Sequence, residues 1–151
     1  MIPGPLIDCY VISPDRTSSA VTSFLNNFVS NHEASFHRHD PAEVLGLPLE
    51  LSLEAILDFL EKNVDREYAF YWRNMDDTEP YHAMAVFCKD GSLILGLSPT
   101  IDVHEHVAKD YLNRMKKFVA TDTGYCAVEY APPSSRQEFY DHWKTWKDYC
   151  S

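Results

Sequence analysis

The sequence contains no apolar run that approaches the roughly 20 residues of a membrane-spanning helix. Residues 1–5 do not combine a basic region with a following long apolar segment, so no signal peptide is indicated. Cys9, Cys88, Cys126 and Cys150 show no close CxxC spacing, and three of them lie within apolar runs, which is typical of reduced core cysteines in a cytosolic protein. We therefore expect a cytoplasmic protein that does not contact membranes.

Motifs of several enzyme classes are also missing. The chain has no G-x-S-x-G nucleophile elbow and no glycine-rich phosphate loop of the G-x-G-x-x-G or G-x-x-x-x-G-K-[ST] type. Cys88 and Cys126 lie in expected strands, where a buried thiol stays protonated and inert. The sequence thus predicts a protein that is not an enzyme, with a small enzyme or ligand-binding module as the alternative.

Basic residues are few. Thirteen Lys and Arg oppose twenty-three Asp and Glu, which gives a formal net charge of −10 at pH 7. Such a charge disfavours nucleic acid and anionic membrane surfaces and favours basic partners. Solubility alone explains a charge of this size equally well.

The 151 residues and their 45% hydrophobic content fit one domain, 1–151, with a core of its own. Its centre is the stretch 81–98, in which two apolar runs flank Asp90-Gly91, the strongest short signal for a β-hairpin. Both faces of this hairpin are nearly free of charge, so we expect a central place in a sheet covered on both sides. A two-residue type I′ turn at Asp90 and Gly91 would pair Cys88 with Leu93, Val86 with Leu95 and Met84 with Leu97.

The remaining elements follow from hydrophobic periodicity and capping residues. Apolar residues at helical spacing predict a helix that ends near Val29, and Ser13 and Pro14 are suitable for its start. Residues 30–48 are turn-rich and predict a long loop that could hold a short edge strand at Ala34–His37. Further strands are predicted at 6–12, 68–72 and 124–129, and further helices after Ser52, after Asp102, and after Ser134 or Ser135. The order predicts an α+β fold with a mainly antiparallel sheet, including the 82–98 hairpin in a central meander, packed by about four helices.

Histidines and carboxylates give one candidate site for a metal or a small ligand. His37, His39 and Asp40 lie close together in the 30–48 loop, and imidazole and carboxylate groups are ordinary metal ligands. The spacing is a weak indication, and exposed or capping histidines are the more common explanation. We therefore expect no metal or other cofactor, and we keep these three residues as the site of the alternative function.

Aromatic rings beside acidic residues form the more unusual pattern. Trp72 and Tyr81 flank an acidic loop, and an acidic helix face precedes them. Aromatic anchors beside carboxylates suit a protein interface, because a few desolvated rings hold a partner that long-range charge attraction has steered. Most rings of this kind nevertheless belong to a core. The expected partner-binding residues are Asp76, Asp77, Glu79, Tyr81, Trp72, Glu54, Asp58 and Glu61.

Four segments together resemble small bacterial immunity proteins of contact-dependent growth inhibition and other polymorphic toxin systems. They are residues 11–16, 69–74, 86–98 and 129–133, which supply a strand end, a strand, the central hairpin and a proline stop. The resemblance implies a cytosolic protein that binds a cognate toxin domain, often a basic nuclease, and neutralises it. It carries no catalytic motif. The acidic net charge agrees with a basic partner.

Overall fold

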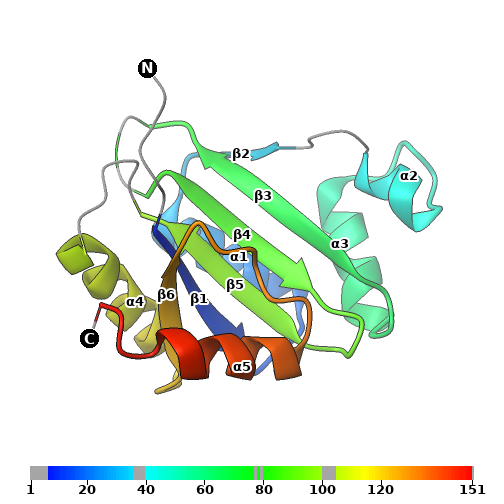
Figure 1. Ribbon diagram of the computed structural model, residues 1–151. Coiled ribbons are helices and arrows are strands. Elements are labelled where there is room, and N and C mark those ends of the chain that lie inside the picture. Colours follow the sequence, from blue (N-terminus) through cyan, green and yellow to red (C-terminus); the bar gives the residue numbers. More distant parts are fainter. Residues whose placement is uncertain (1–6, 36–39, 77, 79, 100–104, 151) are drawn as a thin grey trace.

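A computed structural model describes residues 7–35, 40–76, 78, 80–99 and 105–150 (Figure 1). The strands described there form one antiparallel sheet in the order β2-β3-β4-β5-β1-β6. This confirms the predicted α+β class. The strands are β1 (Ile7–Ser13), β2 (His32–Ser35), β3 (Tyr68–Asn74), β4 (His82–Phe87), β5 (Leu93–Ser98) and β6 (Gly124–Val128). The helices are α1 (Ser18–Phe28), α2 (Pro41–Leu45), α3 (Leu53–Lys62), α4 (Glu105–Val119) and α5 (Arg136–Trp146).

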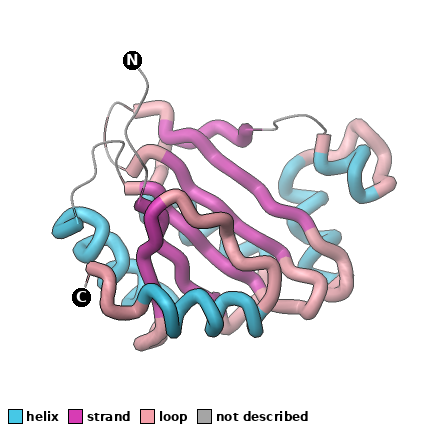
Figure 2. The backbone as a smooth tube through the Cα atoms, in the orientation of Figure 1, coloured by secondary structure: helices cyan, strands magenta, loops and turns pink. Residues whose placement is uncertain are grey.

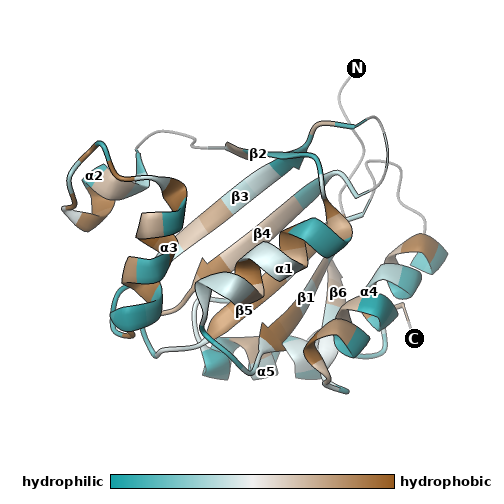
Figure 3. Cartoon of the chain, turned by 180° about the vertical axis from the view of Figure 1, so that it is seen from behind, coloured by the Kyte–Doolittle hydropathy of each residue, from teal (hydrophilic) through white to brown (hydrophobic). Residues whose placement is uncertain are grey.

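The sheet separates two hydrophobic cores. Side chains alternate between its faces, so Cys9 and Val11 of β1 belong to one core and Tyr10 and Ile12 to the other. The first core is covered by α1, α3 and α4, which lie in front of the sheet in the view from behind (Figure 3). The second core is covered by α5, the helix in front of the sheet in Figures 1 and 2. The expected central, two-sided burial of the hairpin is therefore confirmed.

The register of the hairpin differs by one residue from the predicted one. Phe87 pairs with Leu93 and Val86 with Ile94. Of the two turn residues only Gly91 has a positive φ, 91°, whereas a type I′ turn needs positive φ at both positions. The loop therefore has three residues and closes between Cys88 and Ser92, whose N–H and carbonyl oxygen bond at 2.9 Å.

The side chain of Asp90 fixes this longer turn. Its carboxylate accepts hydrogen bonds from the Ser92 N–H at 3.0 Å and from the Ser92 hydroxyl at 2.6 Å. The shift of one residue changes which side chains share a face. Leu93, Leu95 and Leu97 lie in the core under α1, α3 and α4 together with Phe87, Ala85 and Ala83, and not with Cys88, Val86 and Met84.

Capping residues set the helix starts, as expected at two positions and differently at a third. Ser52 and Ser135 cap α3 and α5 as predicted. The first helix is capped by Thr17, whose hydroxyl oxygen accepts the Ala20 N–H at 3.0 Å. The predicted cap, Ser13, still belongs to β1, and its hydroxyl donates to the Asp15 carbonyl instead. Within the stretch predicted as a long loop, β2 begins two residues before the predicted strand and α2 follows it.

Arg16, in the connection between β1 and α1, joins three other parts of the chain. Its guanidinium lies 5.1 Å from the centre of the Phe87 ring, and burial lowers its pKa. Its N–H groups donate to carbonyl oxygens from the end of α3, the connection between α3 and β3, and the hairpin loop. The acceptors are Leu60 (2.9 Å), Asn63 (3.2 Å), Arg66 (2.6 Å), Cys88 (2.8 Å) and Ser92 (3.2 Å).

None of the helices in the described ranges combines the length and the apolar composition that crossing a bilayer requires.

Candidate functional site

The structure places the expected interface residues at two distant ends of β3. Helix α3 lies near the beginning of β3, and the loop that contains Asp76 follows the end of β3 at Asn74 (Figure 1). The seven residues of β3 separate these two ends by about 20 Å. The acidic helix and the acidic loop are therefore two surfaces, and no pattern in the sequence indicated their separation.

Side chains before and within the loop hold its beginning in place. The Asn31 amide donates to the Asp76 carboxylate at 2.9 Å, and the Asp76 N–H donates to the Asn74 side-chain oxygen at 3.0 Å. Tyr81 is 38% exposed, and its ring centre lies 4.2 Å from that of His82. Asp77 and Glu79, the other predicted contacts of this loop, lie outside the described residues.

Trp72 cannot anchor a partner in this structure, so the prediction for it was wrong. Its side chain is 1% exposed and stacks on Phe70 with a ring separation of 5.6 Å. The reason is that its side chain faces the core covered by α1, α3 and α4, where Ala34 of the paired strand β2 packs as well. An indole next to an acidic loop has the same sequence signature whether it faces the core or the solvent.

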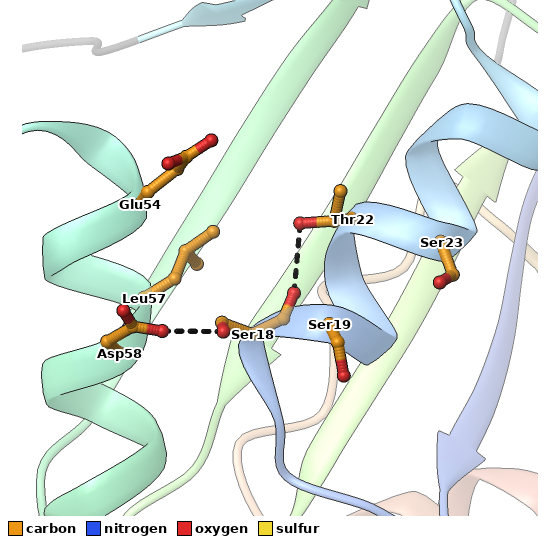
Figure 4. A pocket seen from close by; sticks show the side chains of 7 residues that line it. All are labelled: Ser18, Ser19, Thr22, Ser23, Glu54, Leu57 and Asp58. Carbon is orange, nitrogen blue, oxygen red and sulfur yellow. Dashed lines mark hydrogen bonds between the residues drawn. The ribbon is translucent and has the colours of Figure 1, made fainter.

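The acidic face of α3 is turned toward the start of α1 (Figure 4). The Asp58 carboxylate accepts the Ser18 hydroxyl at 2.6 Å, and the Glu61 carboxylate accepts the Ser18 N–H at 2.8 Å. Both carboxylates thereby satisfy groups at the N-terminal end of α1, where negative charge is favourable. These two predicted contact residues have a structural role in addition to any role in binding.

Glu54 points into a shallow hollow between α1 and α3 (Figure 4). The hollow has a volume of about 330 Å³, and Leu57 and Asp58 contribute to its α3 side. Its α1 side consists of the hydroxyl-bearing residues Ser18, Ser19, Thr22 and Ser23. An acidic and hydroxyl-rich surface of this kind offers hydrogen-bond acceptors to a basic side chain.

Negative charge is concentrated in residues 40–67, which comprise α2, α3 and their connections and which we call the acidic segment. It contains eight Asp and Glu and two Lys and Arg, so it carries −6 of the net charge of −10. Arg66 is turned inward, because it donates to the Leu45 carbonyl at 2.9 Å and lies over the Phe59 ring. The ion pairs found within the described ranges involve no carboxylate of this segment.

Exposed apolar side chains lie among these carboxylates. Leu49 is 66% exposed, Val64 55% and Val44 54%. Val44 also lines a second hollow of about 440 Å³ together with Asp65, Glu67 and Lys89. In the sequence, leucines alternate with Gly46, Pro48 and Glu50 over residues 45–51. This alternation indicates that some leucines are exposed, but it does not indicate which. Leu47 and Leu51 pack against the core, and Leu49 does not.

Of the three residues proposed for a metal or small ligand, Asp40 is the one that the structure describes. Its carboxylate caps α2 by accepting the Ala42 N–H at 2.9 Å. His37 and His39 lie outside the described residues. Within the part of the chain that the structure describes, no group of three or more His, Cys, Asp or Glu could hold a metal ion.

A half-buried carboxyl group on the sheet was not foreseen. Asp8 of β1 accepts a hydrogen bond from the hydroxyl of Ser98, a β5 residue that is 2% exposed. Burial, partly offset by this hydrogen bond and reinforced by the Glu129 carboxylate, raises the pKa of Asp8 to about 6. Burial and the nearby Asp8 also raise the pKa of the Tyr10 hydroxyl. No local pattern indicates this group, because Asp8 and Ser98 are 90 residues apart.

The architecture defines an α+β protein built on an antiparallel sheet with helices on both faces. Neither family models, nor curated proteins, nor solved structures include a match to this chain. Function is therefore inferred from the charge, exposure and contacts of the chain's own residues.

Proposed function

We propose that this protein binds a cognate bacterial toxin domain, a basic nuclease, and neutralises it in the cytoplasm, as immunity proteins do. The observation that carries the proposal is the acidic segment, in which Val44, Leu49 and Val64 are exposed among carboxylates. Seven of its eight acidic residues are exposed: Asp40, Glu43, Glu50, Glu54, Asp58, Asp65 and Glu67.

The two kinds of side chain have different effects on binding. A group of exposed carboxylates attracts a positively charged partner over a distance and raises the association rate. The carboxylates add little affinity by themselves. Apolar side chains that become desolvated at the centre of an interface supply most of the affinity. The acidic segment has both, and we assign the principal contact to it and a lesser one to Asp76 and Tyr81 at the other end of β3.

Co-expression tests the function directly. The full chain is produced together with the toxin domain encoded by the adjacent upstream reading frame, and both growth and co-purification are measured. We expect restored growth and a stable complex. A toxin that kills the cells undiminished and is not retained by the protein contradicts the proposal.

Charge reversal tests the role of the acidic segment. We expect Glu43→Lys, Glu50→Lys and Glu54→Lys together to slow association with the toxin by about tenfold or more at low salt, because steering depends on the local field. Stopped-flow or surface-binding kinetics at two salt concentrations measure this rate. Since these side chains are exposed, circular dichroism should show an unchanged fold.

The matched control has the same change in net charge at another place. Asp110, Asp122 and Asp141 are exposed acidic residues of α4, the turn after it and α5. Their replacement by lysine should change the rate much less than reversal in the acidic segment. Equal effects of the two triple variants would mean that only the total charge matters.

Replacement of Leu49 tests the apolar anchor. We expect Leu49→Ser to weaken toxin binding by about tenfold or more, mainly through faster dissociation, because an anchor acts after encounter. Met75→Ser is the control, since Met75 is 46% exposed but lies beyond the far end of β3. A dissociation rate of Leu49→Ser equal to that of the wild type would remove Leu49 from the interface.

A further inference from the structure

Three of the four cysteines meet inside the core under α4. Cys9 of β1 and Cys126 of β6 are direct cross-strand partners, and their Sγ atoms are 3.1 Å apart. Cys150, which follows α5, belongs to the same core cluster, and the neighbouring Cys126 thiol raises the pKa of the Cys150 thiol. Cys9 and Cys126 are fully buried, whereas Cys150 is 9% exposed and lies nearest to solvent. The fourth cysteine, Cys88, belongs to the core on the opposite face of the sheet.

We propose that these three cysteines form an oxidation site, at which hydrogen peroxide converts Cys9 and Cys126 into a cross-strand disulfide and Cys150 is the thiol that reacts first. Directly opposed residues of an antiparallel pair have Cα separations within the range that disulfides span. The two sulfur atoms need to approach each other by only about 1 Å to reach bonding distance. The register of β1 and β6 therefore does not have to change.

The chemistry balances in three steps. The sulfur of Cys150 attacks the peroxide, so an S–O bond forms, the O–O bond breaks, and hydroxide leaves with the thiol proton as water. The Cys126 sulfur then attacks the Cys150 sulfur, and a second water leaves with the Cys126 proton. The Cys9 sulfur finally attacks the Cys126 sulfur, and Cys150 leaves and takes the Cys9 proton. In sum two thiols lose two electrons and two protons, and one peroxide is reduced to two waters.

The surroundings of Cys150 determine the rate at which peroxide oxidises its thiol. The neighbouring Cys126 thiol, together with burial, raises the pKa of the Cys150 thiol. Cys150 lowers the pKa of the Cys126 thiol, but Cys9 and burial outweigh it and raise that pKa as well, so the second step is also slow. The thiolate is the reactive form, so oxidation is slow at neutral pH and becomes faster by about tenfold for each pH unit while the thiol remains mostly protonated. Lys109, which lowers this pKa, and Glu105, which raises it, are the charged groups of α4 near Cys150.

The disulfide would close a span of 117 residues and tie the edge strand β6 to its neighbour. Cross-links over such long spans stabilise a protein mainly by restricting its unfolded chain. We expect the melting temperature to rise by about 5–15 °C on oxidation and to return to its original value after reduction. The site is distant in the sheet from the acidic segment, so this inference does not rest on the proposed function.

The test is to treat the purified full chain with hydrogen peroxide, block the remaining thiols after denaturation, and map the disulfides by mass spectrometry. We expect one product, in which Cys9 is linked to Cys126 and both Cys88 and Cys150 are blocked as free thiols. A final product that links Cys126 to Cys150, a Cys150 sulfinic acid with Cys9 and Cys126 still reduced, or no disulfide at all would overturn the proposal.

Variants separate the roles of the cysteines. Cys150→Ser should slow formation of the Cys9–Cys126 disulfide by about tenfold or more, and Cys88→Ser should leave its rate unchanged. Equal rates in the wild type and Cys150→Ser would overturn the role of Cys150 as the first thiol. The wild-type map decides the pairing without any variant, so it does not depend on whether a substitution at the buried Cys9 still folds.

Discussion

Arg16→Ala should lower the free energy of unfolding by about 3–5 kcal/mol, measured by urea denaturation and followed by circular dichroism. An arginine side chain has five N–H donors. In this protein they reach five backbone carbonyl oxygens, from the end of α3, the connection between α3 and β3, and the hairpin loop. Alanine would leave these carbonyls without their charged donor, and it would also remove the cation that lies over the Phe87 ring.

Arg16→Lys gives a graded comparison. An ammonium group has three donors and cannot reproduce the planar fork of a guanidinium, so this variant should lose about 1–3 kcal/mol. Arg114→Ala removes the same charge from an exposed helix position, where the guanidinium lies over the Phe28 and Tyr111 rings. It should cost less than about 1 kcal/mol. If Arg16→Ala were no more destabilising than Arg114→Ala, Arg16 would not hold these three parts together.

Asp8→Asn should raise the free energy of unfolding by about 2–3 kcal/mol at pH 7.5. In the folded state burial, countered in part by the Ser98 hydrogen bond and increased by Glu129, raises the pKa of Asp8 from the ordinary 3.8 to about 6. At neutral pH the protein thus holds a poorly solvated carboxylate. Asparagine keeps the acceptor oxygen for the Ser98 hydroxyl and carries no charge.

The pH dependence gives the sign of the effect. A folded-state pKa above the unfolded one means that the folded protein binds the Asp8 proton more tightly. The contribution of Asp8 to the free energy of unfolding is therefore fully present below about pH 4. It falls as the pH rises toward 6 and stays low above that value. The stability difference between Asp8→Asn and the wild type should be small at pH 4 and should grow to its full value by about pH 7.

The free energy of unfolding is compared between the wild type and Asp8→Asn at each pH. Because the other carboxylates are the same in both proteins, the difference reports on Asp8 alone. Chemical denaturation at a series of pH values from 4 to 8 measures both. Asp110→Asn makes the same chemical change at an exposed position of α4, and it should shift stability by less than about 0.5 kcal/mol throughout. A stability difference for Asp8→Asn that is constant with pH, or a loss of stability at pH 7.5, would contradict the raised pKa.

Much of the secondary structure could be predicted from local sequence. Helix α1 shows apolar residues at helical spacing, and Val21, Phe24, Leu25 and Phe28 are indeed buried. Ser52 and Ser135 accept hydrogen bonds in the first turns of their helices, as short polar caps do. These features depend on neighbours within four residues. The net charge of the acidic segment could also be predicted, because it is the sum of the charges in one continuous stretch of sequence.

The candidate site was only partly predictable. Glu54 and Asp58 lie on the acidic surface as expected, but Trp72 is buried and the Asp76 loop is at the other end of β3. The exposure of Leu49 was not predictable, since Leu47 and Leu51, which have similar sequence neighbours, pack against the core. Which apolar residue remains outside depends on how α2 and α3 pack, and no local pattern encodes that packing.

The sequence by itself determined the class of fold, the approximate positions of its elements and the sign of its charge. Only the tertiary structure decided the hairpin register, the burial of Trp72, the contact of Asp8 with Ser98 and the meeting of Cys9 with Cys126. Local signals suffice for the first group, because capping and periodicity act over one or two turns. The second group depends on which strands become neighbours and in which register, and these pairings join residues as much as 117 positions apart.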